Sequence, residues 1–252
     1  MSFCQLHWNS QTLQKQTTTW VLLPEVGTPP FAVFYLLHGL SDDHTMWMRR
    51  TRIEAYADRW PIIIVMPDGG RGFYTNHVAG PKWATHIAEE LPARIERTFS
   101  ARTTRDGRCI GGLSMGGYGA MRLALGYPDR YVSANSHSGA LLGPSMHRGV
   151  ISMDEYHQMF GAAYEGSDSD LLVLAKRAKT SGVTLPKLMI DCGRDDHLLE
   201  ANRTVHRELA ALQIEHAYDD DLPGGHDWNY WDARISTAIE FHARHLGVRP
   251  AS

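Results

Sequence analysis

Short apolar runs that end in turn residues alternate along this chain with segments of helical spacing. The apolar runs are rich in β-branched and aromatic residues and cover residues 17–24, 31–39, 61–70 and 184–193. The segments of helical spacing cover residues 44–60, 84–99, 116–128 and 198–213. Continuous apolar runs of this length are typical of strands that are buried on both faces of a parallel sheet. The alternation therefore predicts an α/β fold, a doubly wound and mostly parallel sheet with helices on both faces.

The strand order and the chain length give further expectations. The early strands follow one another with no long helix between them, so we expect an antiparallel N-terminal edge. Because 252 residues are enough for one well-buried α/β core, we expect residues 1–252 to form a single domain. Residues 140–170 break the alternation with glycine, serine and aspartate. We interpret residues 140–180 as an excursion that borders the site.

Charge and composition exclude several classes of partner. The net charge is -3 and there is no dense run of lysine and arginine, which argues against nucleic acid or an anionic membrane surface. No apolar run approaches the roughly 20 residues that would span a bilayer. The N-terminus lacks the pattern of a secretory signal, and the three cysteines are too few and too scattered for a disulfide framework. We therefore expect a cytoplasmic protein that acts on a small, largely uncharged molecule.

Residues 112–116, Gly-Leu-Ser-Met-Gly, match the G-x-S-x-G pattern of a nucleophile elbow. In that turn a strained backbone lifts the serine hydroxyl into the open, and the glycines let strand and helix approach without Cβ clashes. The helical segment follows at once, and its N-terminus would favour negative charge forming beside Ser114. The alternative is a glycine-rich packing turn. The companion residues described next favour Ser114 as a nucleophile.

A serine hydroxyl is a poor nucleophile unless a base, itself oriented by a carboxylate, lies beside it. In this pattern the acid and then the histidine follow the serine along the chain. His226 stands in a glycine turn after the last expected strand, which favours a general base over a histidine in a surface loop. Asp195 and Asp196 both follow an apolar run, and periodicity does not choose between them. Asp191 lies too far inside the expected strand.

Acyl transfer also needs hydrogen-bond donors for the developing oxyanion, normally two backbone N–H groups. Met115, directly after the serine, is expected to supply one of them. The loop after residues 31–40 is expected to supply the other through Leu40. His38 precedes the serine, so we interpret it as a residue that holds this loop by hydrogen bonds and not as the base.

The sequence gives no convincing metal or cofactor site. It lacks HExxH, clustered Cys/His pairs, a Walker lysine and the glycine spacing of a dinucleotide loop. Asp219, Asp220 and Asp221 are interpreted as a solvated turn. Four aromatic residues are candidates to line an acyl pocket, although each is as well suited to the core. They are Trp47, Tyr74, Trp83 and Trp228.

Several stretches resemble the esterase D-like family of α/β-hydrolases, and within it the branch of tributyrin esterases and acetyl esterases. They are "YLLHGLSDDHTMW", "MPDGGRGFYTN", "EELPARIERTF", "GLSMGGYGAMRLAL", "FGAAYEGSDSDL" and "CGRDDHLLEANRTVHREL" through "LPGGHDWNYW". The resemblance runs from about residue 6 to residue 245. It implies the α/β-hydrolase fold, a cofactor-free serine carboxylesterase for short acyl chains, and a tendency to form homo-oligomers.

The resemblance also carries over site residues. The family's G-x-x-D motif aligns on residues 193–196 and selects Asp196 as the acid. His226 matches the family histidine in G-G-H-x-W, and Leu40 and Met115 match its oxyanion amides. Alternative substrates with the same mechanism are S-formylglutathione and acetyl or feruloyl groups on carbohydrate. A hypothesis from a different functional class is that the protein is an acyltransferase or a non-catalytic relative that binds a ligand.

Overall fold

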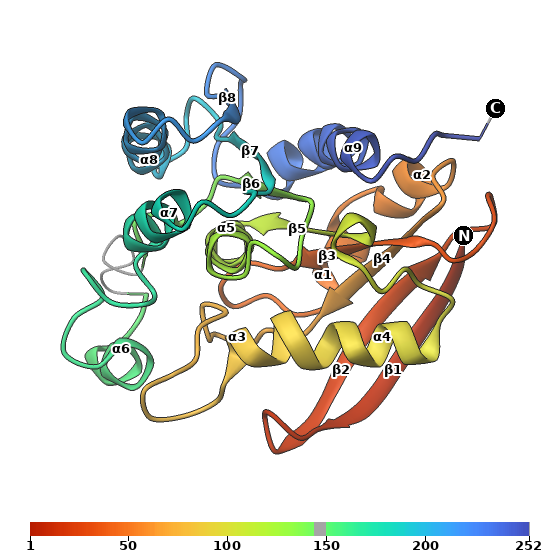
Figure 1. Cartoon of the computed structure of the whole chain (residues 1–252), viewed down its shortest axis with the longest axis horizontal. Coiled ribbons are helices and arrows are strands. Elements are labelled where there is room, and N and C mark those ends of the chain that lie inside the picture. The colour runs from red at the N-terminus through yellow and green to blue at the C-terminus, as the bar shows by residue number, and fades with distance from the viewer. Residues whose placement is uncertain (144–149, 252) are drawn as a thin grey trace.

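The computed structural model describes residues 1–143 and 150–251, which contain a sheet of eight strands (Figure 1). The strands are β1 (Ser2–Ser10), β2 (Lys15–Leu23), β3 (Ala32–Leu37), β4 (Ile62–Pro67), β5 (Arg108–Leu113), β6 (Ser133–His137), β7 (Lys187–Asp191) and β8 (His216–Asp219). Every residue of β3 and β4 is buried. Their continuous apolar sequences are therefore those of strands covered on both faces.

The sheet has the order β1-β2-β4-β3-β5-β6-β7-β8. The β1/β2 and β2/β4 pairs are antiparallel, and all later pairs are parallel. This confirms the predicted α/β fold, including its antiparallel N-terminal edge. Because the carboxyl ends of β3, β5, β7 and β8 meet at one edge of the sheet, the loops that follow them can share one site.

Helices cover both faces of the sheet, as the alternation predicts (Figure 1). They are α1 (Met46–Arg50), α2 (Ile53–Ala57), α3 (Trp83–Thr85), α4 (Leu91–Thr98), α5 (Met115–Gly126), α6 (Met153–Phe160), α7 (Leu171–Thr180), α8 (Leu199–Ala211) and α9 (Trp228–His245). The π-helical turn His86–Glu90 joins α3 to α4, and a 3-10 turn covers Arg105–Gly107. One apolar core holds α1, α2 and α9 against the sheet, and the other holds α3, α4, α5, α7 and α8.

The segment 44–60 forms two short helices instead of one. Thr51 separates them, because its backbone is extended at φ -133° and ψ 170°. The Thr51 hydroxyl donates to the Trp47 carbonyl and accepts a hydrogen bond from the Ile53 N–H at 3.2 Å. The threonine side chain thus ends one helix and begins the next, which apolar spacing does not reveal.

Helix α9 was not among the expected helices, although its start has a recognisable signal. The Asp227 carboxylate accepts hydrogen bonds from the Asn229 and Tyr230 N–H groups and so caps the helix. The cap is therefore the residue directly after His226, and the helix begins at Trp228. The cap fixes the end of the loop that carries this histidine.

The excursion over residues 140–180 contains α6 and α7. Helix α6 begins with a capping box between Ser152 and Glu155, and Asp170 caps α7. Residues 144–149 of the excursion lie outside the described part of the chain. Within the described part, no helix combines the length and the apolar character that crossing a membrane requires.

Candidate active site

Ser114 occupies the tight turn between β5 and α5. Its backbone lies at φ 51° and ψ -116°, a strained conformation for a residue with a Cβ atom. The Ser114 N–H donates to the His137 carbonyl at 2.9 Å, and the Ser114 carbonyl accepts from the N–H groups of Tyr118 and Ala140. These three backbone hydrogen bonds hold the strained turn in place. The serine side chain is thereby fixed at the edge of the sheet.

Gly116 lets the first turn of α5 lie directly against the end of β3. A Cβ atom at this position would lie 2.5 Å from the Leu37 carbonyl oxygen and 2.6 Å from that of His38. Only a residue without a Cβ atom permits this approach. The second glycine of the G-x-S-x-G pattern is therefore required by packing, as the elbow interpretation predicts.

His226 links Ser114 to Asp196 through its two ring nitrogens. Its Nε2 lies 3.0 Å from the Ser114 Oγ, and its Nδ1 lies 2.9 Å from Asp196 Oδ2 and 3.1 Å from Oδ1. A carboxylate only accepts hydrogen bonds, so Nδ1 carries the proton and Nε2 is free to accept one from the serine hydroxyl. The arrangement joins a hydroxyl, a base and an orienting carboxylate in one chain of hydrogen bonds.

The structure separates the two candidate acids, Asp195 and Asp196, and places Asp191 with a different partner. Asp196 is buried and contacts His226, whereas its neighbour Asp195 is exposed. Asp191 is fully buried at the end of β7 and contacts a different histidine, His137, at 2.9 Å. Among these three residues, Asp196 is the one that reaches the histidine beside Ser114.

The Asp196 carboxylate is held in its ionised form. Burial alone would raise its pKa, but hydrogen bonds from His226 and from the Leu198 N–H keep the pKa of Asp196 below its ordinary value. An ionised acid at this position favours the Nδ1–H tautomer of His226 and stabilises positive charge on the ring.

The loop that carries Asp196 is attached directly to the loop that carries His226. The Arg194 N–H donates to the Leu222 carbonyl at 2.9 Å, and the Asp195 N–H donates to the Gly224 carbonyl at 3.0 Å. The two loops approach most closely at Gly193, where a Cβ atom would lie 2.2 Å from the Gly224 carbonyl oxygen. The Asp196 carboxylate and the His226 ring are therefore positioned by backbone contacts and not by their own side chains alone.

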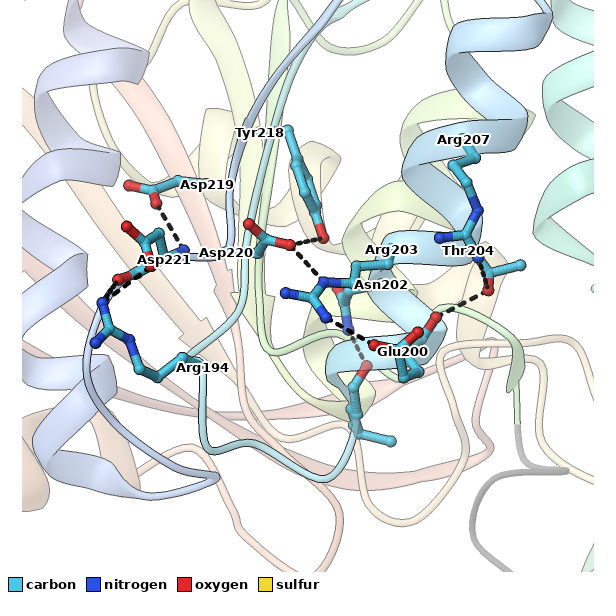
Figure 2. A network of polar contacts seen from close by, with 11 residues as sticks. Arg194, Glu200, Asn202, Arg203, Thr204, Arg207, Tyr218, Asp219, Asp220 and Asp221 are labelled. Carbon is cyan, nitrogen blue, oxygen red and sulfur yellow. Dashed lines mark hydrogen bonds and ion pairs between the residues drawn. The ribbon is translucent and has the colours of Figure 1, made fainter.

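Surface ion pairs also join neighbouring segments in this region (Figure 2). The Arg194 guanidinium pairs with Asp221 at 3.0 Å, and Arg203 of α8 pairs with Asp220 at 2.7 Å. Asp219 contacts Arg234 of α9 at 3.7 Å. The three aspartates were interpreted from the sequence as a solvated turn; their side chains are partly or fully exposed, and each of them also pairs with an arginine of another element. A run of charged residues in the sequence does not reveal such partners, because the arginines that pair with these aspartates are distant in sequence.

The two backbone amides predicted for the oxyanion lie beside the serine. Met115 is the first residue of α5, where the helical N–H groups have no acceptor within the helix. Leu40 lines the cleft that contains Ser114 and His226. The Leu40 N–H donates no backbone hydrogen bond to any residue in the described part of the chain. Both amides are thus available to a ligand.

His38 holds the loop that presents Leu40, as its position in the sequence suggested. The Gly69 N–H donates to its Nε2 at 2.8 Å, and its Nδ1 donates to the Gly39 carbonyl at 2.8 Å. The Tyr74 hydroxyl donates to the His38 carbonyl at 3.0 Å. Both ring nitrogens are occupied by the backbone, so His38 is a loop anchor.

A cleft of about 300 Å³ opens above these groups. It is lined by Gly39, Leu40, Asp42, Arg50, Leu113, Ser114, His226, Asp227, Trp228 and Trp231. Its wall is apolar at Trp228 and Trp231, and its rim is charged. Asp42, Arg50, Asp227 and Trp231 were not anticipated from the sequence. The only signals were that Asp227 is the variable position of the G-G-H-x-W motif and that Trp231 follows this motif by three residues.

Of the four aromatic residues predicted to line a pocket, Trp228 lines this cleft. Trp47 is buried beneath it, with its ring 5.4 Å from that of Trp228 and its Nε1–H donating to the Leu37 carbonyl at 3.1 Å. Tyr74 is fully buried and supports His38, and Trp83 is buried beside His86. Neither Tyr74 nor Trp83 is among the residues that line the cleft.

Within the described part of the chain, one group of side chains is suited to sharing a metal ion. It consists of Asp196, His197 and His226, whose ligand atoms all lie within 4.8 Å of one another. Two of the three belong to the hydrogen-bonded chain described above.

The strand order and the serine turn between β5 and α5 define the class of protein, an α/β-hydrolase. Comparison with known proteins gives the family. A model of the Esterase family, described as "Putative esterase", matches residues 10–242. The acetyl esterase of Caldicellulosiruptor saccharolyticus is 30% identical, over 97% of this chain and 99% of the relative. The chain therefore belongs to the Esterase family and is a carboxylic ester hydrolase.

Solved structures of two Staphylococcus aureus enzymes are similar along nearly their whole length. The fluorophosphonate-binding serine hydrolase FphF superposes with a TM-score of 0.89 at 28% identity, over 96% of this chain and 98% of that one. The S-formylglutathione hydrolase FrmB superposes with a TM-score of 0.87 at 29% identity and the same coverage. Both resemblances agree with the α/β-hydrolase class and with the predicted family.

Proposed function

We propose that this esterase hydrolyses short-chain acyl esters through an acyl-enzyme intermediate, with Ser114 as nucleophile, His226 as general base and Asp196 as the residue that orients the base. The observation that carries the proposal is the hydrogen-bonded chain from Ser114 Oγ through both nitrogens of His226 to Asp196, at 3.0 Å and 2.9 Å. Nucleophile, base and orienting acid meet the geometric requirement for covalent catalysis.

In the proposed first half-reaction, His226 Nε2 accepts the hydroxyl proton while Ser114 Oγ attacks the ester carbonyl carbon. The carbonyl oxygen becomes an oxyanion and accepts hydrogen bonds from the Leu40 and Met115 N–H groups. His226 then returns the proton to the departing alcohol, and the acyl group stays on Ser114. Asp196 stabilises the transient positive charge on the histidine.

In the second half-reaction, water attacks the acyl-enzyme and gives its proton to His226 Nε2. The same two amides stabilise the second oxyanion. The proton passes to Ser114 Oγ as the ester bond breaks, and the carboxylic acid leaves. Every group in this scheme belongs to the chain, so the proposed reaction uses no cofactor.

The proposed preference for short acyl chains is supported by the size of the cleft and by the acetyl esterase among the relatives. The test is a series of p-nitrophenyl esters from acetate to decanoate. We expect kcat/KM for acetate and butyrate to exceed that for decanoate by about tenfold or more, which is the discrimination that a cleft shaped for short acyl groups would give. A preference for decanoate would contradict the assignment.

A second candidate substrate is S-formylglutathione, and one feature of the cleft favours it. Arg50 is exposed and lines the cleft, where it offers a cation to a leaving group that carries carboxylates. The similarity to FrmB supports the same candidate. If it is correct, Arg50→Gln raises KM for S-formylglutathione and leaves KM for p-nitrophenyl acetate unchanged. Arg49→Gln is the matched control, since Arg49 lies on the same helix but does not line the cleft.

We further propose that the protein acts as a single domain in the cytoplasm, on a small molecule and without a nucleic-acid partner. Acetyl or feruloyl groups on carbohydrate are alternative substrates, and transfer to an alcohol in place of water is an alternative reaction. A panel of acetylated sugars, feruloyl esters and added alcohol acceptors separates these from simple ester hydrolysis.

A further inference from the structure

His197 lies beside the proposed catalytic residues but has no part in the proposed proton transfers. Its ring centroid is 4.6 Å from that of His226, and its Nδ1 is 3.6 Å from Asp196 Oδ1. The His197 side chain is 61% exposed, whereas the Asp196 side chain is fully buried. An imidazole that solvent reaches freely therefore stands next to a buried carboxylate and a second imidazole.

These three side chains supply a ligand set that suits zinc. Two imidazole nitrogens and one carboxylate oxygen, with a further position open, are a known set for Zn²⁺. Bonds of about 2.0–2.2 Å in tetrahedral geometry place ligand atoms roughly 3.3 Å apart. Asp196 Oδ1 lies 3.1 Å from His226 Nδ1 and 3.6 Å from His197 Nδ1, on either side of this value. The ligand atoms all lie within 4.8 Å of one another, so side-chain rotations would bring them to an ion.

We propose that Asp196, His197 and His226 form an inhibitory site for a zinc-like divalent cation. The ion binds the two imidazoles and the carboxylate, and the proton of His226 Nδ1 is released to solvent. No electron transfer is involved. The exposed His197 is the ligand that an ion from solution reaches first, and the other two complete the site. Sequence spacing does not suggest the site, because 29 positions separate the two histidines.

Occupation of the site would disable the proposed mechanism. A metal on His226 Nδ1 replaces the proton that Asp196 holds and uses the carboxylate as a ligand. The ring then carries the charge of the ion, and protonation of Nε2 by Ser114 becomes unfavourable. This inhibitory consequence rests on the proposed function of Ser114 and His226, whereas ion binding itself does not.

The first experiment measures inhibition of p-nitrophenyl acetate hydrolysis by ZnCl₂ after the protein has been treated with a chelator. The wild-type rate should fall at micromolar Zn²⁺ and return when EDTA is added. His197→Ala, compared with its own metal-free rate, should raise the inhibition constant by about tenfold or more. Because His197 is exposed, its replacement leaves no buried group unpaired.

His206→Gln is the matched control. It disrupts the other close pair of histidines, in which His206 Nδ1 lies 2.8 Å from His216 Nε2, and this pair lies outside the proposed site. Inhibition should be unchanged in this variant. If His197→Ala is inhibited like the wild type, or if His206→Gln removes the inhibition, the proposed site is wrong.

Calorimetry with ZnCl₂ separates failure of the site from failure of the proposed function. Ser114 is not a ligand, so Ser114→Ala should bind Zn²⁺ as the wild type does, while adding His197→Ala to it should abolish that binding event. This binding result would support the proposed zinc site even if the protein hydrolysed no ester. Equal binding by the single and the double variant would overturn it.

Discussion

A Cβ atom on Gly193 would lie 2.2 Å from the carbonyl oxygen of Gly224, so the loops that carry Asp196 and His226 touch at a point where only glycine fits. Gly193→Ala should push the two loops apart and lengthen the hydrogen bond between acid and base. Because a misplacement of about 1 Å costs on the order of 100-fold in rate, kcat should fall by about 10- to 100-fold. Steady-state kinetics on p-nitrophenyl acetate measures this loss.

Gly225→Ala is the control for that substitution. A Cβ atom there would meet its nearest atom, Asp227 Oδ2, at 3.5 Å, which is an ordinary contact. This variant should keep kcat within about threefold of the wild type. Equal effects of the two substitutions would show that the contact between the loops does not position the acid and the base.

The pair of neighbouring aspartates gives a second prediction. Asp196→Asn should lower kcat by about 10⁴-fold, because an amide can donate to His226 Nδ1 and so favours the wrong tautomer. Asp195→Asn should change kcat by less than about threefold, since Asp195 is exposed. The two variants change the same atoms one residue apart. If Asp195→Asn causes the larger loss, the acid assignment is wrong.

Glu90 gives a prediction about the acid stability of the fold. Burial would raise its pKa, but hydrogen bonds from Ser10, His86 and the N–H groups of Gln11 and Thr12 lower the pKa of Glu90 to about 2. Its folded-state pKa is below the unfolded value, so its stabilisation is present above about pH 4.5 and is lost as pH falls towards 2. Because the carboxylate is partly exposed, we expect a contribution of about 1 kcal/mol after screening by solvent.

The measurement is the free energy of unfolding in urea between pH 2 and pH 6, for the wild type and for Glu90→Gln. The wild type should lose stability towards low pH, and the variant should lose about 1 kcal/mol less over the same range. Identical pH dependence in both proteins would contradict the account of this carboxylate.

The fold could be predicted from the sequence because strands that are buried on both faces have continuous apolar sequences. The continuous apolar runs that became β3 and β4 are buried on both faces, and the absence of a long helix between the first strands indicated the antiparallel edge. Helix boundaries were less accessible. The break at Thr51 depends on a side-chain hydrogen bond, and such a bond does not alter the spacing of apolar residues in the sequence.

Within the site, the features that a short motif defines could be predicted from the sequence. The features that depend on loop conformation could not. The turn at Ser114 follows from flanking glycines, whereas Asp195 and Asp196 occupy equivalent pattern positions and differ only in the direction that the loop gives each side chain. Nor does a pattern distinguish an aromatic residue that lines a cleft from one buried beneath it. The Trp228 and Trp47 rings contact each other edge to face and differ in this respect.

The central claim, that Ser114 is the nucleophile, is tested most directly by mapping a serine-directed phosphonate by mass spectrometry. The rate of p-nitrophenyl acetate hydrolysis should fall in proportion to the amount of label on the peptide that contains Ser114. Ser114→Ala should fold normally, take up no label and lose at least about 10³-fold in kcat. Label on a different residue, or near-normal turnover by a folded Ser114→Ala variant, would contradict the claim.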